Sequence, residues 1–178
     1  VNPSVLINTR VGRLITARTR QELAINEMSQ NVLSAFNRFN GFGGMRKAIG
    51  KNGTVFKTDD FGIVRGIGKH WNDVFADVES LKGQLTPQQY EYAKTFNDVI
   101  DDVRLLREIH MLNNLPREIN GKLWVPRVVR GIDNIEIINP TNHKADRYWE
   151  LATDGAKNGV DYADPLETIN LYLRETYN

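Results

Sequence analysis

Residues 85–109 read LTPQQYEYAKTFNDVIDDVRLLREI, and this stretch decides the fold class. Thr86 followed by Pro87 is typical of a helix start, with threonine as N-cap and proline at the first helical position. Downstream, apolar residues alternate at three- and four-residue steps, as in the seam between packed helices. The seam consists of Tyr92, Phe96, Val99, Val103 and Leu106, widened by Ile100, Leu105 and Ile109. The pattern predicts a helix over 87–113 that packs against at least one other helix.

A second long amphipathic helix is predicted upstream, over 11–40. Residues 1–9 show no period and contain an early proline, which favours an extended lead-in. From there to residue 40, apolar residues recur at helical steps: Leu14, Ala17, Ala24, Ile25, Met28, Val32, Ala35, Phe36 and Phe39. The first turns carry arginines, which oppose the positive end of the helix dipole; these are Arg10, Arg13, Arg18 and Arg20. An acidic partner would compensate for this charge.

The segment 41–68 is rich in glycine and carries weaker signals. The runs 54–57 and 62–65 are β-prone and predict two small strands, which fit a hairpin with a longer loop. Glycine gives the backbone wide conformational freedom, so we expect this segment to be the most mobile part of the chain.

Shorter elements complete the prediction. Residues 69–82 form a helical stripe, and 122–130 are β-prone but contain Pro126, which confines them to a sheet edge or an extended connector. A short strand is predicted at 135–138, and helices are predicted at 140–154 and 164–177. The fold class is therefore mainly α, with long amphipathic helices and one or two minor β-hairpin or extended segments. We divide the chain into an N-terminal arm and long helix (1–40), a glycine-rich segment (41–68) and a helical domain (69–178).

Composition excludes several classes of site. The 178 residues include no cysteine, which removes disulfides, thiol nucleophiles and cysteine-ligated zinc, and the three histidines are far apart in sequence. No apolar run approaches the roughly 20 residues of a membrane-spanning helix. Because the chain begins with Val1 and ends inside a helical pattern, we expect it to be a fragment of a larger chain.

Charge is distributed unevenly along the sequence. Residues 1–70 contain 11 Lys and Arg against 4 Asp and Glu, a balance of +7, whereas residues 71–178 contain 12 against 18, a balance of −6. The basic half could contact nucleic-acid phosphate, anionic lipid or a protein partner. The candidate contact residues are Arg13, Arg18, Arg20, Arg38, Arg46 and Lys47.

Three patterns invite a chemical interpretation, and each has a simpler one. Carboxylates gather on one side of the 87–113 helix at Asp98, Asp101, Asp102 and Glu108, but Arg104 and Arg107 at helical spacing favour an ion-paired surface over a cation site. The glycines of 41–47 lack the spacing of a phosphate-binding loop. His70 beside Trp71 is more typical of packing at a helix start than of a general base. We therefore predict no catalytic residue, metal site or cofactor.

The region 69–131 resembles a known pattern. Leu85-Thr86-Pro87 opens a long helix, and after a short loop the chain continues with Gly121, Lys122, Leu123, Trp124, Val125, Pro126 and Arg127. This is similar to a pattern in large multidomain proteins of tailed phages, including the internal virion (ejection) proteins of short-tailed bacteriophages. Trp124 stands where that pattern has tyrosine or phenylalanine. The resemblance gives Trp124, Val125, Pro126 and Arg127 a structural role.

The resemblance implies a non-catalytic virion component that oligomerises and assists genome delivery through the host cell envelope. It further implies homo-oligomers, contacts with virion proteins of the portal or tail region, possible DNA or peripheral membrane contact, and a location in the virion and, on infection, the host envelope. The alternative is a nucleic-acid-binding accessory module of a large virion-associated protein, such as a virion polymerase. For residues 1–40 we predict docking on a neighbouring subunit or on another virion component, and we predict that they do not close the core of their own chain.

Overall fold

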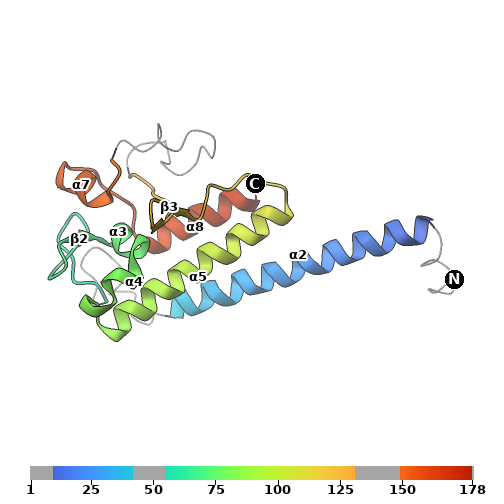
Figure 1. The fold of residues 1–178 in the computed structure, drawn as a ribbon, viewed down its shortest axis with the longest axis horizontal. Helices are drawn as coiled ribbons and strands as arrows, with labels where there is room; N and C mark the ends of the chain where they lie inside the picture. The colour runs from blue at the N-terminus through green and yellow to red at the C-terminus, as the bar shows by residue number, and fades with distance from the viewer. Residues whose placement is uncertain (1–9, 42–54, 131–148, 178) are drawn as a thin grey trace.

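The computed structural model describes residues 10–41, 55–130 and 149–177, and it is mainly helical, as predicted (Figure 1). Its long helices are α2 (Arg10–Gly41), α5 (Pro87–Ile109) and α8 (Pro165–Tyr177). Shorter helical elements are α3 (Trp71–Ala76), α4 (Val78–Leu81), the 3₁₀ turn η2 (Lys82–Gln84) and α7 (Ala152–Lys157).

Helix α5 begins where the sequence predicts. The Thr86 hydroxyl accepts a hydrogen bond from the Gln89 amide, the Gln89 side chain accepts one from the Thr86 amide, and Pro87 occupies the first turn. The helix ends at Ile109, four residues before the predicted end at 113. His110 closes it, and the left-handed Met111 (φ 58°) turns the chain away.

Helices α2 and α5 lie antiparallel, and only the second half of α2 reaches the body (Figure 1). There the Phe39 ring stacks on Tyr92 at 4.9 Å between centroids and meets Phe96 edge-on at 5.8 Å. Val32, Ala35 and Phe39 are at most 3% exposed. The prediction that residues 1–40 do not close the core of their own chain is therefore wrong for this half, because its apolar stripe meets the α5 seam within the same molecule.

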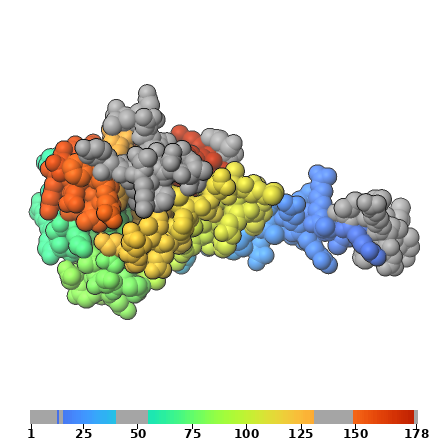
Figure 2. Space-filling view, turned by 45° about the horizontal axis from the view of Figure 1, so that its top comes forward, coloured from blue at the N-terminus to red at the C-terminus, as the bar shows by residue number. Residues whose placement is uncertain are grey.

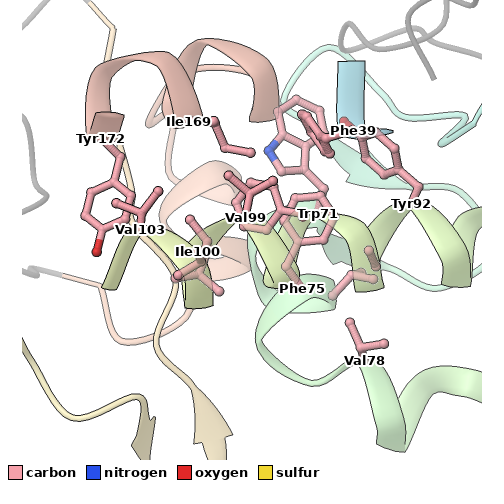
Figure 3. Packing of buried hydrophobic residues seen from close by; sticks show 14 of the residues in the cluster. Phe39, Trp71, Phe75, Val78, Tyr92, Val99, Ile100, Val103, Ile169 and Tyr172 are labelled. Carbon is pink, nitrogen blue, oxygen red and sulfur yellow. The ribbon is translucent and has the colours of Figure 1, made fainter. Parts of the chain in front are cut away.

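The core is centred on α5, whose buried side chains pack against residues of α2, α3 and α8 (Figure 3). Phe75 of α3 stacks on Phe96 of α5 with their ring centroids 4.2 Å apart, and Ile169 of α8 is fully buried. The aromatic side chains Phe39, Phe56, Phe75, Tyr92 and Phe96 form a continuous cluster. Residues from all three predicted segments thus contribute to one core.

Two small antiparallel hairpins accompany the helices. β1 (Ile63–Val64) pairs with β2 (Lys69–His70), and β3 (Glu118–Ile119) pairs with β4 (Lys122–Leu123). The strand predicted at 54–57 is not found, because residues 55–57 are not in a strand and residue 54 lies outside the described residues. Instead, Thr58 forms a single bridge with Val64, and the regular pairing of β1 is with residues 69–70. The second hairpin turns through Asn120 and Gly121 at φ 53° and 76°, values that favour these residue types.

The 69–82 and 122–130 regions refine the prediction. The single helix expected over 69–82 is instead two helices, because the helical conformation is interrupted at Asp77, between α3 and α4. His70 does pack at the helix start: its Nδ1 accepts from the Asn72 amide at 3.0 Å. The 122–130 run is an extended connector, as predicted, with β4 at its start and a bridge from Val129 to Tyr162.

The C-terminal region confirms one predicted helix and corrects another. The predicted strand at 135–138 and most of the predicted helix at 140–154 lie outside the described residues, but 149–151 are not helical and α7 begins only at Ala152. Helix α8 matches the predicted 164–177 closely, and the Asp164 carboxylate accepts from the Glu167 amide at 2.9 Å as its cap.

Candidate functional site

Residues 10–24 of α2, here called the arm, project beyond the body (Figures 1 and 2). Ile25 and Met28 are the first α2 residues on its inner face that pack against the core. At 1.5 Å per residue the arm is about 22 Å long. The helix thus has one half built into the core and one half that extends beyond the described body.

The arm carries exposed basic side chains. Arg13, Arg18 and Arg20 are exposed, and Arg18 pairs with Glu22 at 3.3 Å one turn further on. Arg13 and Arg20 are seven residues apart, so they lie on the same side of the helix. Leu23 is 61% exposed near the base of the arm, where an apolar side chain gains nothing from solvent.

The structure brings together only part of the predicted contact set. Arg38 belongs to the packed half of α2, where it pairs with Asp98 of α5 at 3.2 Å. It is therefore separated from the arm arginines. Arg46 and Lys47 lie outside the described residues.

The Trp124–Arg127 motif is buried, which fits the structural role expected of it. Trp124 lies 5.8 Å from Tyr172 of α8 between ring centroids, and the Arg104 guanidinium lies over its ring at 5.9 Å. Arg127 is 4% exposed and donates to the carbonyl oxygens of Trp149 and Glu150, both at 2.6 Å. The connector thereby fixes the position of Trp149 and Glu150, the residues shortly before α7.

Asp73 of α3 completes a buried polar junction with Arg127 and Thr153. Its carboxylate accepts from the amides of Ala152 at 2.9 Å and Thr153 at 2.7 Å and from the Thr153 hydroxyl, and it lies 3.7 Å from Arg127 Nη2. The amides are orphan donors of the first turn of α7, whose own N-cap residue, Leu151, offers no side-chain cap. Asp73 therefore caps a helix about 80 residues away in sequence.

The junction has the chemistry of a structural anchor. The Thr153 hydroxyl donates to Asp73 and accepts from the His70 amide at 3.0 Å, so it is held at both ends. The Asp73 oxygens are engaged by amides, a hydroxyl and a guanidinium. Sequence reasoning did not single out Asp73 or Thr153.

The carboxylate face of α5 is ion-paired, but with different partners from those predicted. Asp98 pairs with Arg38, and Asp101 pairs with Arg117 at 2.6 Å. The predicted partners Arg104 and Arg107 turn instead toward the loop after α5. Arg104 donates to the Leu115 carbonyl, and Arg107 donates to the Asn114 side chain and the Asn113 carbonyl. Those otherwise unpaired carbonyls compete successfully for the guanidinium groups.

Asp102, on the same face, is disfavoured as an anion. Partial burial and the neighbouring charges of Asp98 and Asp101 raise its pKa, against a smaller lowering by Arg38. Because its pKa is higher in the folded than in the unfolded chain, the charged side chain costs stability above the folded pKa. That cost shrinks as pH falls through the folded pKa and is absent below the unfolded pKa.

We therefore expect Asp102→Asn to raise the free energy of unfolding at pH 7 by up to about 0.5 kcal/mol, a small gain because the site is well solvated. The gain should vanish near pH 3, where the Asp102 carboxyl group is largely protonated in both the folded and the unfolded chain. Urea unfolding at the two pH values measures the difference. Glu91→Gln, an exposed change on the same helix, serves as the control. A gain that is equal at both pH values would show that charge is not its cause.

Among the described residues, no group of three or more His, Asp and Glu side chains converges as a metal site. No helix in the described part of the chain has the length and apolarity needed to cross a membrane. Comparison with protein-family models, curated proteins and solved structures finds no match to this chain.

Proposed function

We propose that this chain is a non-catalytic structural segment of a phage virion protein of the internal virion (ejection) type. In this role it oligomerises and assists genome delivery through the host cell envelope. The observation that carries the proposal is the arm: a helix rooted in the core by Val32, Ala35 and Phe39 that extends about 22 Å into solvent. A rigidly rooted helix presents side chains to a partner at little entropic cost.

The chemistry of the arm favours one kind of partner. Its exposed Arg13, Arg18 and Arg20 favour an acidic surface, and residues 71–178 of another copy carry the balance of −6. Contact between the arm of one copy and the acidic part of the next is heterologous. Such contacts close into rings when the rotation permits. A ring is the assembly that genome passage through a channel requires, and virion proteins near the portal or tail are the further partners proposed.

Replacing Arg13, Arg18 and Arg20 together by glutamate should abolish self-association or shift it to higher protein concentration. Circular dichroism should change little, because the three side chains are exposed. Sedimentation at low and high salt measures the effect, and salt should weaken wild-type assembly in the same direction. The matched control is Lys57, Arg65 and Lys82 to glutamate, three exposed cations on the body. Equal assembly of wild type and arm variant would contradict the proposal.

The alternative, a nucleic-acid-binding accessory module, is favoured by the same three arginines, because phosphate contacts need accessible cations. It predicts retention of DNA with a steep salt dependence. Loss of the three arginines should then reduce the slope of log K against log salt by about 3. DNA retention by the wild type without self-association would favour this alternative over the first proposal.

A further inference from the structure

A cavity of about 740 Å³ opens beside the polar junction, between α3, the β3–β4 hairpin and the start of α7. Its volume lies in the range of pockets that enclose small organic ligands. Parts of the chain that are far apart in sequence supply its walls, so the cavity exists only in the folded molecule.

The floor of the cavity contains no uncompensated charge. Asp73 and Arg127 both line it, with side chains 6% and 5% exposed. As described above, the carboxylate is held by two amides, a hydroxyl and the guanidinium, while the guanidinium also donates to two carbonyls. The pair is therefore fixed in position, and any charge that attracts a ligand must come from elsewhere in the lining.

That charge comes from three lysines. Lys69 of β2, Lys122 of β4 and Lys157 at the end of α7 line the same cavity, and no ion pair joins any of them to the described residues. Glu150 is the one acidic lining residue besides Asp73 among those described. Four cationic groups against two carboxylates leave the cavity with a formal balance of +2. Such a lining attracts a dianion.

The rest of the described lining is largely apolar. Ile119, Leu123 and Trp124 come from the hairpin and connector, Ala76 from α3 and Leu151 from the approach to α7. If only a free inorganic ion bound here, the apolar walls of the cavity would stay in contact with water. A ligand with an apolar or aromatic body would cover them while its charged group reaches the lysines.

We infer that this cavity binds an organic phosphate, with the phosphate at Lys69, Lys122 and Lys157 and an apolar or aromatic body against the apolar part of the lining, which includes Trp124. Lysine is a common phosphate ligand because it supplies a compact, mobile positive charge. A nucleoside monophosphate has this chemistry, either as a free nucleotide or as the 5′-phosphorylated end of a nucleic-acid strand. The inference does not depend on the arm or on self-association.

The test uses the full chain and three probes: AMP, adenosine and inorganic phosphate. Calorimetry should show that AMP binds more tightly than either part of it. In the NMR spectrum, the indole N–H signal of Trp124 should move on titration, while that of the buried Trp71, which does not line the cavity, should not. Equal affinity for AMP and inorganic phosphate would overturn the role of the apolar wall. Absence of AMP binding at millimolar concentration would overturn the site.

Lys122→Gln combined with Lys157→Gln should weaken AMP binding about tenfold or more, because two attractions to the phosphate are lost. Both side chains are exposed, so the fold should persist. The control Lys57→Gln removes an exposed lysine that is absent from the lining and should leave affinity unchanged. Unchanged affinity in the double variant would refute the inference. A 5′-phosphorylated oligonucleotide that binds more tightly than AMP, with the same lysine dependence, identifies a strand end as the source, and the reverse order identifies the free nucleotide.

Discussion

Asp73→Ala is expected to lower the free energy of unfolding by about 3–5 kcal/mol, the range for removing one partner of a buried ion pair. The change leaves Arg127, 5% exposed, without its carboxylate, and it removes the acceptor for the Ala152 amide, the Thr153 amide and the Thr153 hydroxyl. Each buried donor left unpaired costs free energy because it has given up its hydrogen bonds to water. Urea denaturation followed by circular dichroism measures the loss.

Two further variants make this prediction specific. Asp98→Ala also breaks an ion pair, but the paired side chains of Arg38 and Asp98 are 59% and 45% exposed. The free energy of unfolding is therefore expected to fall by at most about 1 kcal/mol. Combining Asp73→Ala with Arg127→Met should cost less than the sum of the single changes, because no unpaired charge remains in the interior. If Asp73→Ala costs no more than Asp98→Ala, the junction does not anchor α7.

Phe96→Ala is expected to cost about 3–5 kcal/mol, the usual range for truncating a buried phenylalanine. Its side chain is 0% exposed and lies between Phe75, at 4.2 Å between centroids, and Phe39, at 5.8 Å. Truncation leaves a void where α2, α3 and α5 meet, and aromatic packing beyond simple burial is also lost. Thermal and urea unfolding should both detect it.

Val103→Asp, on the same seam, should be at least as severe, because it places a carboxylate at a position that is 0% exposed. Leu105→Ala provides the matched control, since Leu105 is 46% exposed on the same helix and its loss should change stability by only about 0.5 kcal/mol. Similar melting of Phe96→Ala and Leu105→Ala would mean that the α5 seam is not buried in solution.

The long helices could be predicted because their signals are local. Thr86 and Pro87 fix the start of α5 through contacts within one turn, and the three- and four-residue seam specifies which face is buried. The same periodicity located α2 and α8. What periodicity does not state is which surface covers an apolar stripe. The stripe of α2 is covered by α5 of its own chain from Ile25 onward, and the arm remains uncovered.

The polar junction and the cavity could not be predicted in this way. Asp73, Arg127 and Thr153 are brought together by tertiary packing, and no spacing in the sequence marks them as neighbours. The charge pattern of α5 was misassigned for a related reason. Arg104 lies three residues after Asp101, a helical spacing, yet the backbone carbonyls of the loop after α5 receive both Arg104 and Arg107.

The capping of α7 by Asp73 has a consequence for the order of folding. A helix of six residues is far below the length at which an isolated helix persists in water. Its first-turn amides find their acceptor, Asp73, only after α3 has reached the start of α7, and α3 is about 80 residues away along the chain. Closing so long a loop carries an entropic penalty that must be met before the contact is gained. We therefore expect α7 to form on the native side of the rate-limiting barrier, so that changes at Thr153 accelerate unfolding and leave the rate of folding nearly unchanged.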